Sequence, residues 1–125
     1  MNIPDGILCS KTHEWVAQIN NETLIGLSDI AIKHFGDIVF IELPEVGTKY
    51  TKNEVFATFE TVKLANEMYM PIGGEIIEIN EDLINSPEKI NEEPFESWLI
   101  KVKPNNFIED SQALMDYNDY KEDFQ

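Results

Sequence analysis

Basic residues are scarce in this sequence. It has 125 residues, of which nine are Lys or Arg and 24 are Asp or Glu, so its formal net charge is -15. That balance argues against a nucleic-acid-binding protein, because contacts with a phosphate backbone require clustered basic side chains, and against binding to an anionic membrane surface. The charge by itself also has an ordinary explanation, since a high net charge keeps a small protein soluble.

Cysteine and long apolar runs are scarce too. The single cysteine, Cys9, cannot form an internal disulfide, so nothing indicates an oxidising compartment, and we interpret it as a structural residue. No segment approaches the ~18 apolar residues of a membrane span. Residues 1–6 lack the features of a signal or transit peptide. The sequence therefore predicts a cytoplasmic protein, or one of the mitochondrial matrix if a transit peptide has been removed.

The common catalytic motifs are missing as well. His13-Glu14 lacks the second histidine of a zinc-binding His-Glu-x-x-His motif, and His34 stands alone. The sequence has no Gly-rich phosphate loop after a predicted strand and no Gly-x-Ser-x-Gly motif. Acidic residues are abundant, but abundance does not make a general acid–base pair, and we expect most of these carboxylates to be solvated.

What the sequence does contain is a series of short apolar stretches separated by turn residues, which is typical of a small β-sandwich or flattened barrel. We predict one domain over residues 1–125, with a core at about 10–103 and an acidic helical segment at 104–125. Residues 1–12 are expected to form an arm that lies on the domain. The predicted strands are 14–19, 23–27, 37–43, 49–51, 54–59, 64–69, 75–80 and 97–103.

Short helices are predicted at the edges of the sheets. Ser28 is a suitable N-cap for a helix over 28–35, and Gly36 would end that helix in a left-handed conformation. Ser86 is predicted to cap a helical turn that opens at Pro87.

Apolar and aromatic residues of the C-terminal segment recur at helical spacing, which predicts one or two amphipathic helices packed on the sheet. The alternative is a frayed acidic tail beyond Asp119. The residues that carry the spacing are Leu114, Tyr117, Tyr120 and Phe124.

Lys63 lies between the predicted strands 54–59 and 64–69, which predicts a hairpin with a lysine at its tip. Such a lysine can be a plain exposed charge, a buried nucleophile, or an attachment point for a carrier group. The neighbouring Glu60 and Glu67 argue against a buried nucleophile, because nearby carboxylates favour the charged ammonium. The residues alone leave the other two uses open.

The residues around this lysine also form a motif. It reads Glu60-Thr61-Val62-Lys63, followed by Glu67, Tyr69, Pro71, Gly74 and Glu75. The motif resembles the lipoylation hairpin of the glycine cleavage system H-protein family, and further similarities cover nearly the whole chain. They fall at residues 11–15, 25–27, 35–47, 80, 85–88, 90–94 and 98–103.

The resemblance implies an all-β hybrid barrel-sandwich, similar to lipoyl domains, with short peripheral helices and a C-terminal helical segment. It implies lipoate in amide linkage to Lys63, attached by a lipoate ligase or octanoyltransferase that recognises Glu60. In this family the lipoyl-lysine arm folds back into a surface cleft when it carries its group. Thr12, Glu14 and Glu67 occupy the positions of this sequence that correspond to residues of that cleft. No metal site is implied.

The family's function is that of a carrier and not of an enzyme. The resemblance implies a monomer that shuttles the aminomethyl group of glycine from a pyridoxal-phosphate glycine decarboxylase to a tetrahydrofolate-dependent aminomethyltransferase. Dihydrolipoyl dehydrogenase would reoxidise the arm. The resemblance thus places the protein in glycine catabolism and one-carbon metabolism, with neither nucleic acid nor membrane as a partner.

Several positions depart from the family pattern. Thr61 replaces the usual Ser, Glu67 replaces the usual Asp, and the loop at 94–98 is one residue shorter than is common in the family. None of these changes removes Lys63 or Glu60. They leave an alternative carrier hypothesis open, namely an H-like paralogue that serves as a lipoyl donor or redox scaffold for other enzymes.

Two further hypotheses fit the residues less well. A Schiff-base lysine would need an apolar pocket, which the flanking glutamates disfavour. A biotin acceptor lysine usually lies between methionines, whereas Lys63 lies between Val62 and Leu64.

Overall fold

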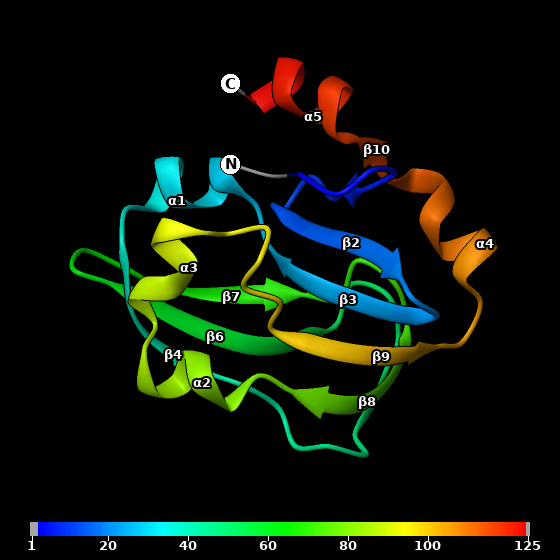
Figure 1. The fold of residues 1–125 in the computed structure, drawn as a ribbon, viewed down its shortest axis with the longest axis horizontal. Coiled ribbons are helices and arrows are strands. Elements are labelled where there is room, and N and C mark those ends of the chain that lie inside the picture. The colour runs from blue at the N-terminus through cyan, green and yellow to red at the C-terminus, as the bar shows by residue number, and fades with distance from the viewer. Residues whose placement is uncertain (1–2, 125) are drawn as a thin grey trace.

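The computed structural model describes residues 3–124 and contains two antiparallel β-sheets with short helices at their edges (Figure 1). The larger sheet has seven strands, in the order β10 (Met115–Asp116), β1 (Leu8–Cys9), β2 (Glu14–Ile19), β3 (Glu22–Leu27), β9 (Ile100–Pro104), β8 (Gly74–Ile79) and β5 (Lys49–Tyr50). The smaller sheet has the order β4 (Ile38–Glu42), β6 (Val55–Thr61) and β7 (Ala65–Tyr69). Both sheets are open, and the predicted all-β architecture is confirmed.

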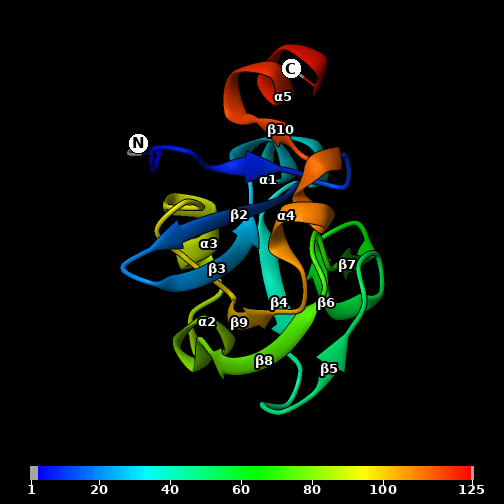
Figure 2. The same cartoon turned by 90° about the vertical axis from the view of Figure 1, so that its right-hand side faces the viewer.

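Short helices join and flank the strands. They are α1 (Asp29–Phe35), α2 (Glu81–Asn85), α3 (Glu88–Glu92), α4 (Phe107–Asp110), the 3-10 turn η1 (Ser111–Ala113) and α5 (Tyr117–Phe124). Figure 2 shows α2 and α3 on one side of the molecule and the β6–β7 hairpin on the other. Among residues 3–124, no helix is long and apolar enough to cross a membrane.

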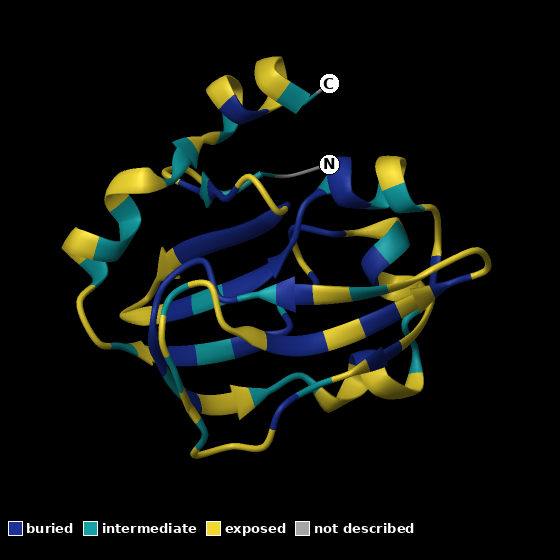
Figure 3. Ribbon diagram, turned by 180° about the vertical axis from the view of Figure 1, so that it is seen from behind, coloured by how far each residue is buried: buried dark blue, intermediate teal, exposed yellow. Residues whose placement is uncertain are grey.

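The main core contains buried residues from both sheets. Figure 3 shows buried stretches on the strands of each sheet. In β6, for example, Phe59 is buried while its neighbours Thr58 and Glu60 are exposed, as the two-residue period of a strand requires. Met68 of β7 is fully buried on the same inner face. The smaller sheet is therefore held by its inner side, and its outer side and the hairpin tip stay accessible.

A second, smaller core lies under the C-terminal helix. It contains Trp15, Phe95 and Tyr120 together with the fully buried Cys9. Burial, and to a lesser degree the nearby carboxylate of Asp29, raises the pKa of the Cys9 thiol to about 12. A thiol that stays protonated in an apolar site fits the interpretation of Cys9 as a structural residue.

The predicted helix 28–35 is confirmed as α1. Ser28 Oγ accepts a hydrogen bond from the backbone N–H of Ala31 at 3.2 Å, which is the N-cap interaction. Gly36 follows the helix with φ of 91°, and its N–H donates to the carbonyl of Ile32. A side chain at residue 36 would be strained at that φ, which explains the glycine.

The predictions for residues 86–103 need two corrections. Pro87, not Ser86, is the N-cap residue of α3, and no side chain caps this helix. The strand predicted at 97–103 begins only at Ile100, and Leu99 before it is completely buried. Residues 97–99 are instead held by hydrogen bonds to the segment that contains α2 and α3.

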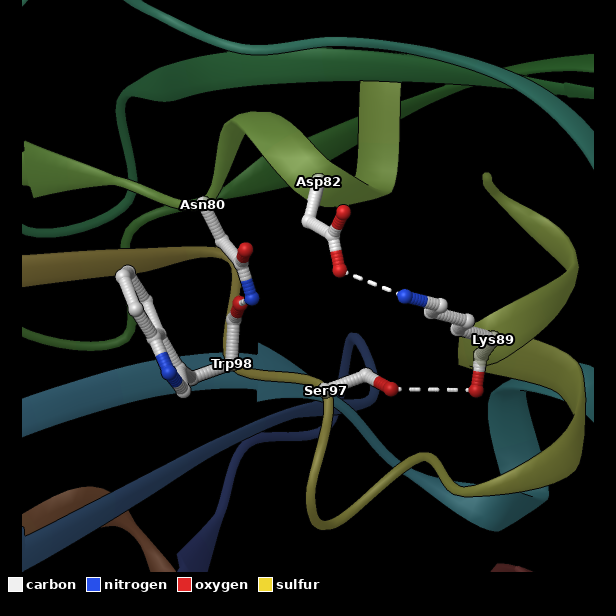
Figure 4. A network of polar contacts seen from close by, with 5 residues as sticks. All are labelled: Asn80, Asp82, Lys89, Ser97 and Trp98. Carbon is white, nitrogen blue, oxygen red and sulfur yellow. Dashed lines mark hydrogen bonds and ion pairs between the residues drawn. The ribbon is translucent and has the colours of Figure 1, made fainter. Parts of the chain in front are cut away.

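Figure 4 shows the contacts that hold this segment. Asn80 Nδ2 donates to the carbonyl oxygen of Trp98 at 2.8 Å, and Ser97 Oγ donates to that of Lys89 at 3.0 Å. Lys89 Nζ also pairs with Asp82 across 2.5 Å, linking α3 to α2. These contacts fix the connection between α3 and β9.

The two ends of the chain form more regular structure than predicted. Residues 8–9 of the expected arm form β1, which pairs with β2 and also with β10. The C-terminal segment is helical at α4 and α5, as predicted, but β10 interrupts it. Helix α5 continues beyond Asp119 to Phe124, so the frayed tail is not what the structure shows. Residues 1–2 and 125 of the predicted domain lie outside the described residues.

Candidate functional site

Lys63 sits in the turn between β6 and β7, which protrudes from one side of the molecule (Figure 1). The N–H of Thr61 donates to the carbonyl of Leu64 at 2.8 Å and closes the turn. The Thr61 hydroxyl lies inside the turn and accepts the backbone N–H groups of Lys63 at 3.3 Å and Leu64 at 3.1 Å. One buried side chain therefore sets the shape of the backbone that carries the lysine.

The side chains beside the lysine are open to solvent. Val62 is 88% exposed and Leu64 is 50% exposed, so two apolar side chains flank the Lys63 ammonium without covering it. Such exposure suits a lysine that another protein must reach. It gives no support to a Schiff-base lysine, which needs a desolvated pocket.

Glu60 and Glu67 lie on the outer face of the smaller sheet. Glu60 is opposite Ala65 across the hairpin, and Glu67 is opposite Thr58, two residue pairs farther from the tip. Residues two apart share a face of a strand, so Glu60, Thr58 and Glu67 all point outward, and all three are exposed. The structure thus places one predicted site residue, Glu60, next to the tip and another, Glu67, along the returning strand.

A groove of about 360 Å³ runs along β7 and brings Thr12 and Glu67 together. Lys63 lines an adjacent hollow of about 290 Å³, and Phe35 lines both. The groove is lined by Lys11, Thr12, His13, Phe35, Ala65, Asn66, Glu67 and Tyr69. The N-terminal motif thus lies on one side of this groove and the hairpin on the other.

Glu14 lies beneath that groove, not among the residues that line it. Glu14 is the first residue of β2 and is 1% exposed. Its carboxylate accepts hydrogen bonds from Ser10 Oγ at 2.8 Å, from Thr12 Oγ1, and from the backbone N–H of Tyr69 at 3.2 Å. Burial raises the pKa of Glu14 to about 7, against the opposing effect of these donors, the Thr12 hydroxyl first. Glu14 can therefore gain or lose a proton near neutral pH.

The backbone of His13 is left-handed, with φ of 80°, and its side chain reaches both the groove and the C-terminal helix. Its Nδ1 is 2.7 Å from the hydroxyl of Tyr120, which in turn is 2.6 Å from Ser28 Oγ. Burial, followed by the nearby His34, lowers the pKa of His13. Helix α5 is thereby anchored to the same loop that carries Thr12 and Glu14.

Six of the residues that line this groove were not among the predicted site residues. They are Lys11, His13, Phe35, Ala65, Asn66 and Tyr69. Tyr69 contributes its backbone N–H, which carries no sequence signal. His13 belongs to the motif at residues 11–15, but no site role was predicted for it. The described residues contain no group of three or more His, Cys, Asp or Glu side chains placed to hold a metal ion.

Fold and site together define a β-sandwich domain that presents a single lysine on a tight, exposed hairpin turn beside a polar groove. A model of the glycine cleavage H-protein family matches residues 7–125. The chain belongs to this family.

Individual relatives agree with the family match. A probable glycine cleavage system H protein from Pyrococcus abyssi is 46% identical over 121 residues, covering 96% of this chain and 90% of that protein. The glycine cleavage system H protein of Halothermothrix orenii is 41% identical, with 98% of both chains covered. The crystal structure of a glycine cleavage system H protein from Mycobacterium marinum superposes with a TM-score of 0.85 at 26% identity, covering 97% of this chain and 98% of that one.

Proposed function

We propose that this protein is the lipoyl carrier of a glycine cleavage system, with lipoate in amide linkage to Lys63. It shuttles the aminomethyl group of glycine between a pyridoxal-phosphate glycine decarboxylase and a tetrahydrofolate-dependent aminomethyltransferase. The family membership of nearly the whole chain supports this function. The observation that carries it is the exposed turn in which Thr61 holds the backbone of Lys63.

The residues of the hairpin fit the attachment step. The Lys63 side chain is exposed, and its neighbours Val62 and Leu64 leave it accessible to an attaching enzyme. Glu60 stands on the outer face two residues before the turn, where a lipoate ligase or octanoyltransferase can read it together with the shape of the turn. The chain's own part in this step is to hold the amine in one place.

The groove fits the group that Lys63 would carry. Phe35 and Ala65 provide apolar surface for an acyl chain, and Thr12 and Glu67 provide polar groups. When bound, lipoate supplies the disulfide that takes up the aminomethyl group and releases it again. A carboxylate such as Glu67 favours a protonated amine, and Glu14 beneath the groove fixes Thr12 and the backbone of Tyr69.

The remaining parts of the proposal follow from this role. The protein acts as a carrier subunit and leaves catalysis to its partners, which include dihydrolipoyl dehydrogenase for reoxidation of the arm. Its acidic surface suits partners with basic entrances, since complementary charge accelerates encounter. We further propose that it works as a single-domain monomer in the cytoplasm.

The exchange of labelled bicarbonate into glycine tests the proposal. Lipoylated protein is mixed with glycine decarboxylase, and the unlipoylated Lys63→Arg variant serves as the control. We expect exchange to depend on the lipoylated protein. Lipoylated protein that gives no stimulation would favour the alternative, an H-like paralogue that donates lipoyl groups or serves as a redox scaffold.

A further inference from the structure

One buried side-chain nitrogen or oxygen atom in the described residues has no hydrogen-bond partner, and it belongs to Asn66. The Asn66 side-chain nitrogen, Nδ2, is out of contact with solvent, yet no acceptor within residues 3–124 receives its protons. Leaving a buried donor unsatisfied costs the protein the desolvation of that group. Folded proteins leave few such groups, so this one calls for an explanation.

The place of Asn66 in the fold suggests what the missing acceptor is. Asn66 is on β7 opposite Phe59, on the inner face of the smaller sheet, and it lines the groove that also holds Thr12 and Glu67. It follows Lys63 by three residues, which span at most about 10 Å of chain. A chain attached to the lysine and folded back along β7 therefore passes Asn66 before it reaches Glu67 and Tyr69.

The chemistry of the lysine decides when an acceptor is present. A free lysine ammonium has three donors and no acceptor, so it cannot satisfy Asn66. Acylation of the amine creates an amide, whose carbonyl oxygen is a good acceptor. An amine carried at the far end of the arm is again a donor, and it matches the carboxylate of Glu67 and not the amide nitrogen of Asn66.

We propose that Asn66 is a positioning residue for the acylated Lys63 arm, and that its side-chain N–H donates to the carbonyl oxygen of the arm's amide. A turn about the last side-chain torsion, which is broad for asparagine, brings the donor into the groove. Asn66 thereby holds the root of the arm, while Thr12 and Glu67 are left free for the group at its tip. This inference rests on the proposed attachment at Lys63.

Nuclear magnetic resonance on the full chain tests the contact without any enzyme assay. Nε-octanoyl-lysine with a ¹⁵N-labelled side-chain amide is incorporated at position 63 by genetic encoding, which supplies the same amide as lipoate and needs no ligase. We expect the side-chain N–H₂ signals of Asn66 to shift relative to the protein with free Lys63. We also expect the order parameter of the arm's amide to stay above about 0.6.

Two variants separate the contact from a general effect on the fold. Asn66→Asp removes the donor at nearly the same shape, and Asn118→Asp adds the same charge at an exposed position of α5. In the Asn66 variant we expect the order parameter of the arm's amide to fall below about 0.6, the range of a flexible chain, and in the Asn118 variant to match the parent. Backbone spectra verify that both are folded.

Asn66 signals that do not respond to acylation would overturn the inference, and this measurement needs no variant. Equal order parameters in the parent and Asn66→Asp would overturn it as well. A failure of the proposed function would look different, because protein purified from its own cells would then carry no acyl group on Lys63, whatever the encoded amide does.

Discussion

The backbone N–H of Tyr69 donates to Glu14 Oε2 across 3.2 Å, and this bond joins the two halves of the site. Tyr69 belongs to the strand that returns from the lysine turn, whereas Glu14 begins the strand that follows the N-terminal motif. The same carboxylate accepts from Ser10 and Thr12. Glu14 therefore acts as the buried link that sets the distance between the hairpin and the opposite wall of the groove.

Protonation of Glu14 gives the protein a pH-dependent stability. Its folded-state pKa of about 7 lies above the ordinary value of 4.5, so the folded state binds this proton more tightly than the unfolded chain. The contribution to stability is fully present below pH 4.5 and is lost as the pH rises through 7. Within this pH window the free energy of unfolding should fall by up to about 1.4 kcal/mol per pH unit because of Glu14, and we expect Glu14→Gln to remove that slope.

Urea unfolding between pH 4.5 and 8 measures this slope as the difference between parent and variant. Glu122→Gln, at an exposed position of α5, is the matched control and should leave the profile unchanged. Parent and Glu14→Gln profiles that run parallel would show that Glu14 does not titrate in this range.

The Thr61 hydroxyl is expected to hold the lysine turn. Thr61→Val keeps the shape of the side chain but loses the acceptor for the N–H groups of Lys63 and Leu64. We expect hydrogen exchange at these two amides to accelerate by about fivefold to tenfold, since a hydrogen bond of this kind is worth about 1 kcal/mol. Thr61→Ser retains the hydroxyl and should exchange like the parent, and protection that survives in the Val variant would argue against this role.

Removal of the Tyr120 hydroxyl is expected to destabilise the anchor of the C-terminal helix. The hydroxyl lies between His13 Nδ1 and Ser28 Oγ, both in buried residues, and phenylalanine leaves them without this partner. Tyr120→Phe should cost about 1–3 kcal/mol in urea unfolding.

Tyr117→Phe provides the comparison for Tyr120. Its hydroxyl donates to Asp29 at 2.6 Å in a part-buried site, where water can replace the lost donor. The loss of stability should be clearly smaller than for Tyr120→Phe. Equal losses would show that the buried hydrogen bonds of Tyr120 with His13 and Ser28 contribute no more to stability than the part-buried bond of Tyr117.

Local patterns predicted the hairpin and α1 closely, because each depends on residues near one another in sequence. Ser28 and Gly36 bound α1 as expected, and two strands lie on either side of Lys63 as predicted. The pairing of β1 with β10 could not be predicted in this way. It joins two-residue strands from opposite ends of the chain, and two residues show no periodicity.

The site was predicted less completely than the fold. Lys63 stood out by its place between two strands, but the roles of Thr12, Glu14 and Glu67 came from the family resemblance. The structure adds that Glu14 supports the groove from below, which depends on a backbone N–H of Tyr69. Asn66 was missed because its distinguishing property, a donor without a partner, exists only in the folded chain.

Intact mass of the protein purified from its own cells tests the attachment of lipoate to Lys63 most directly. The expected result is a mass increase of one lipoyl group in the parent and in Lys33→Arg, an exposed lysine of the same hollow, and none in Lys63→Arg. A parent protein without the adduct, or an adduct that persists in Lys63→Arg, would contradict the account.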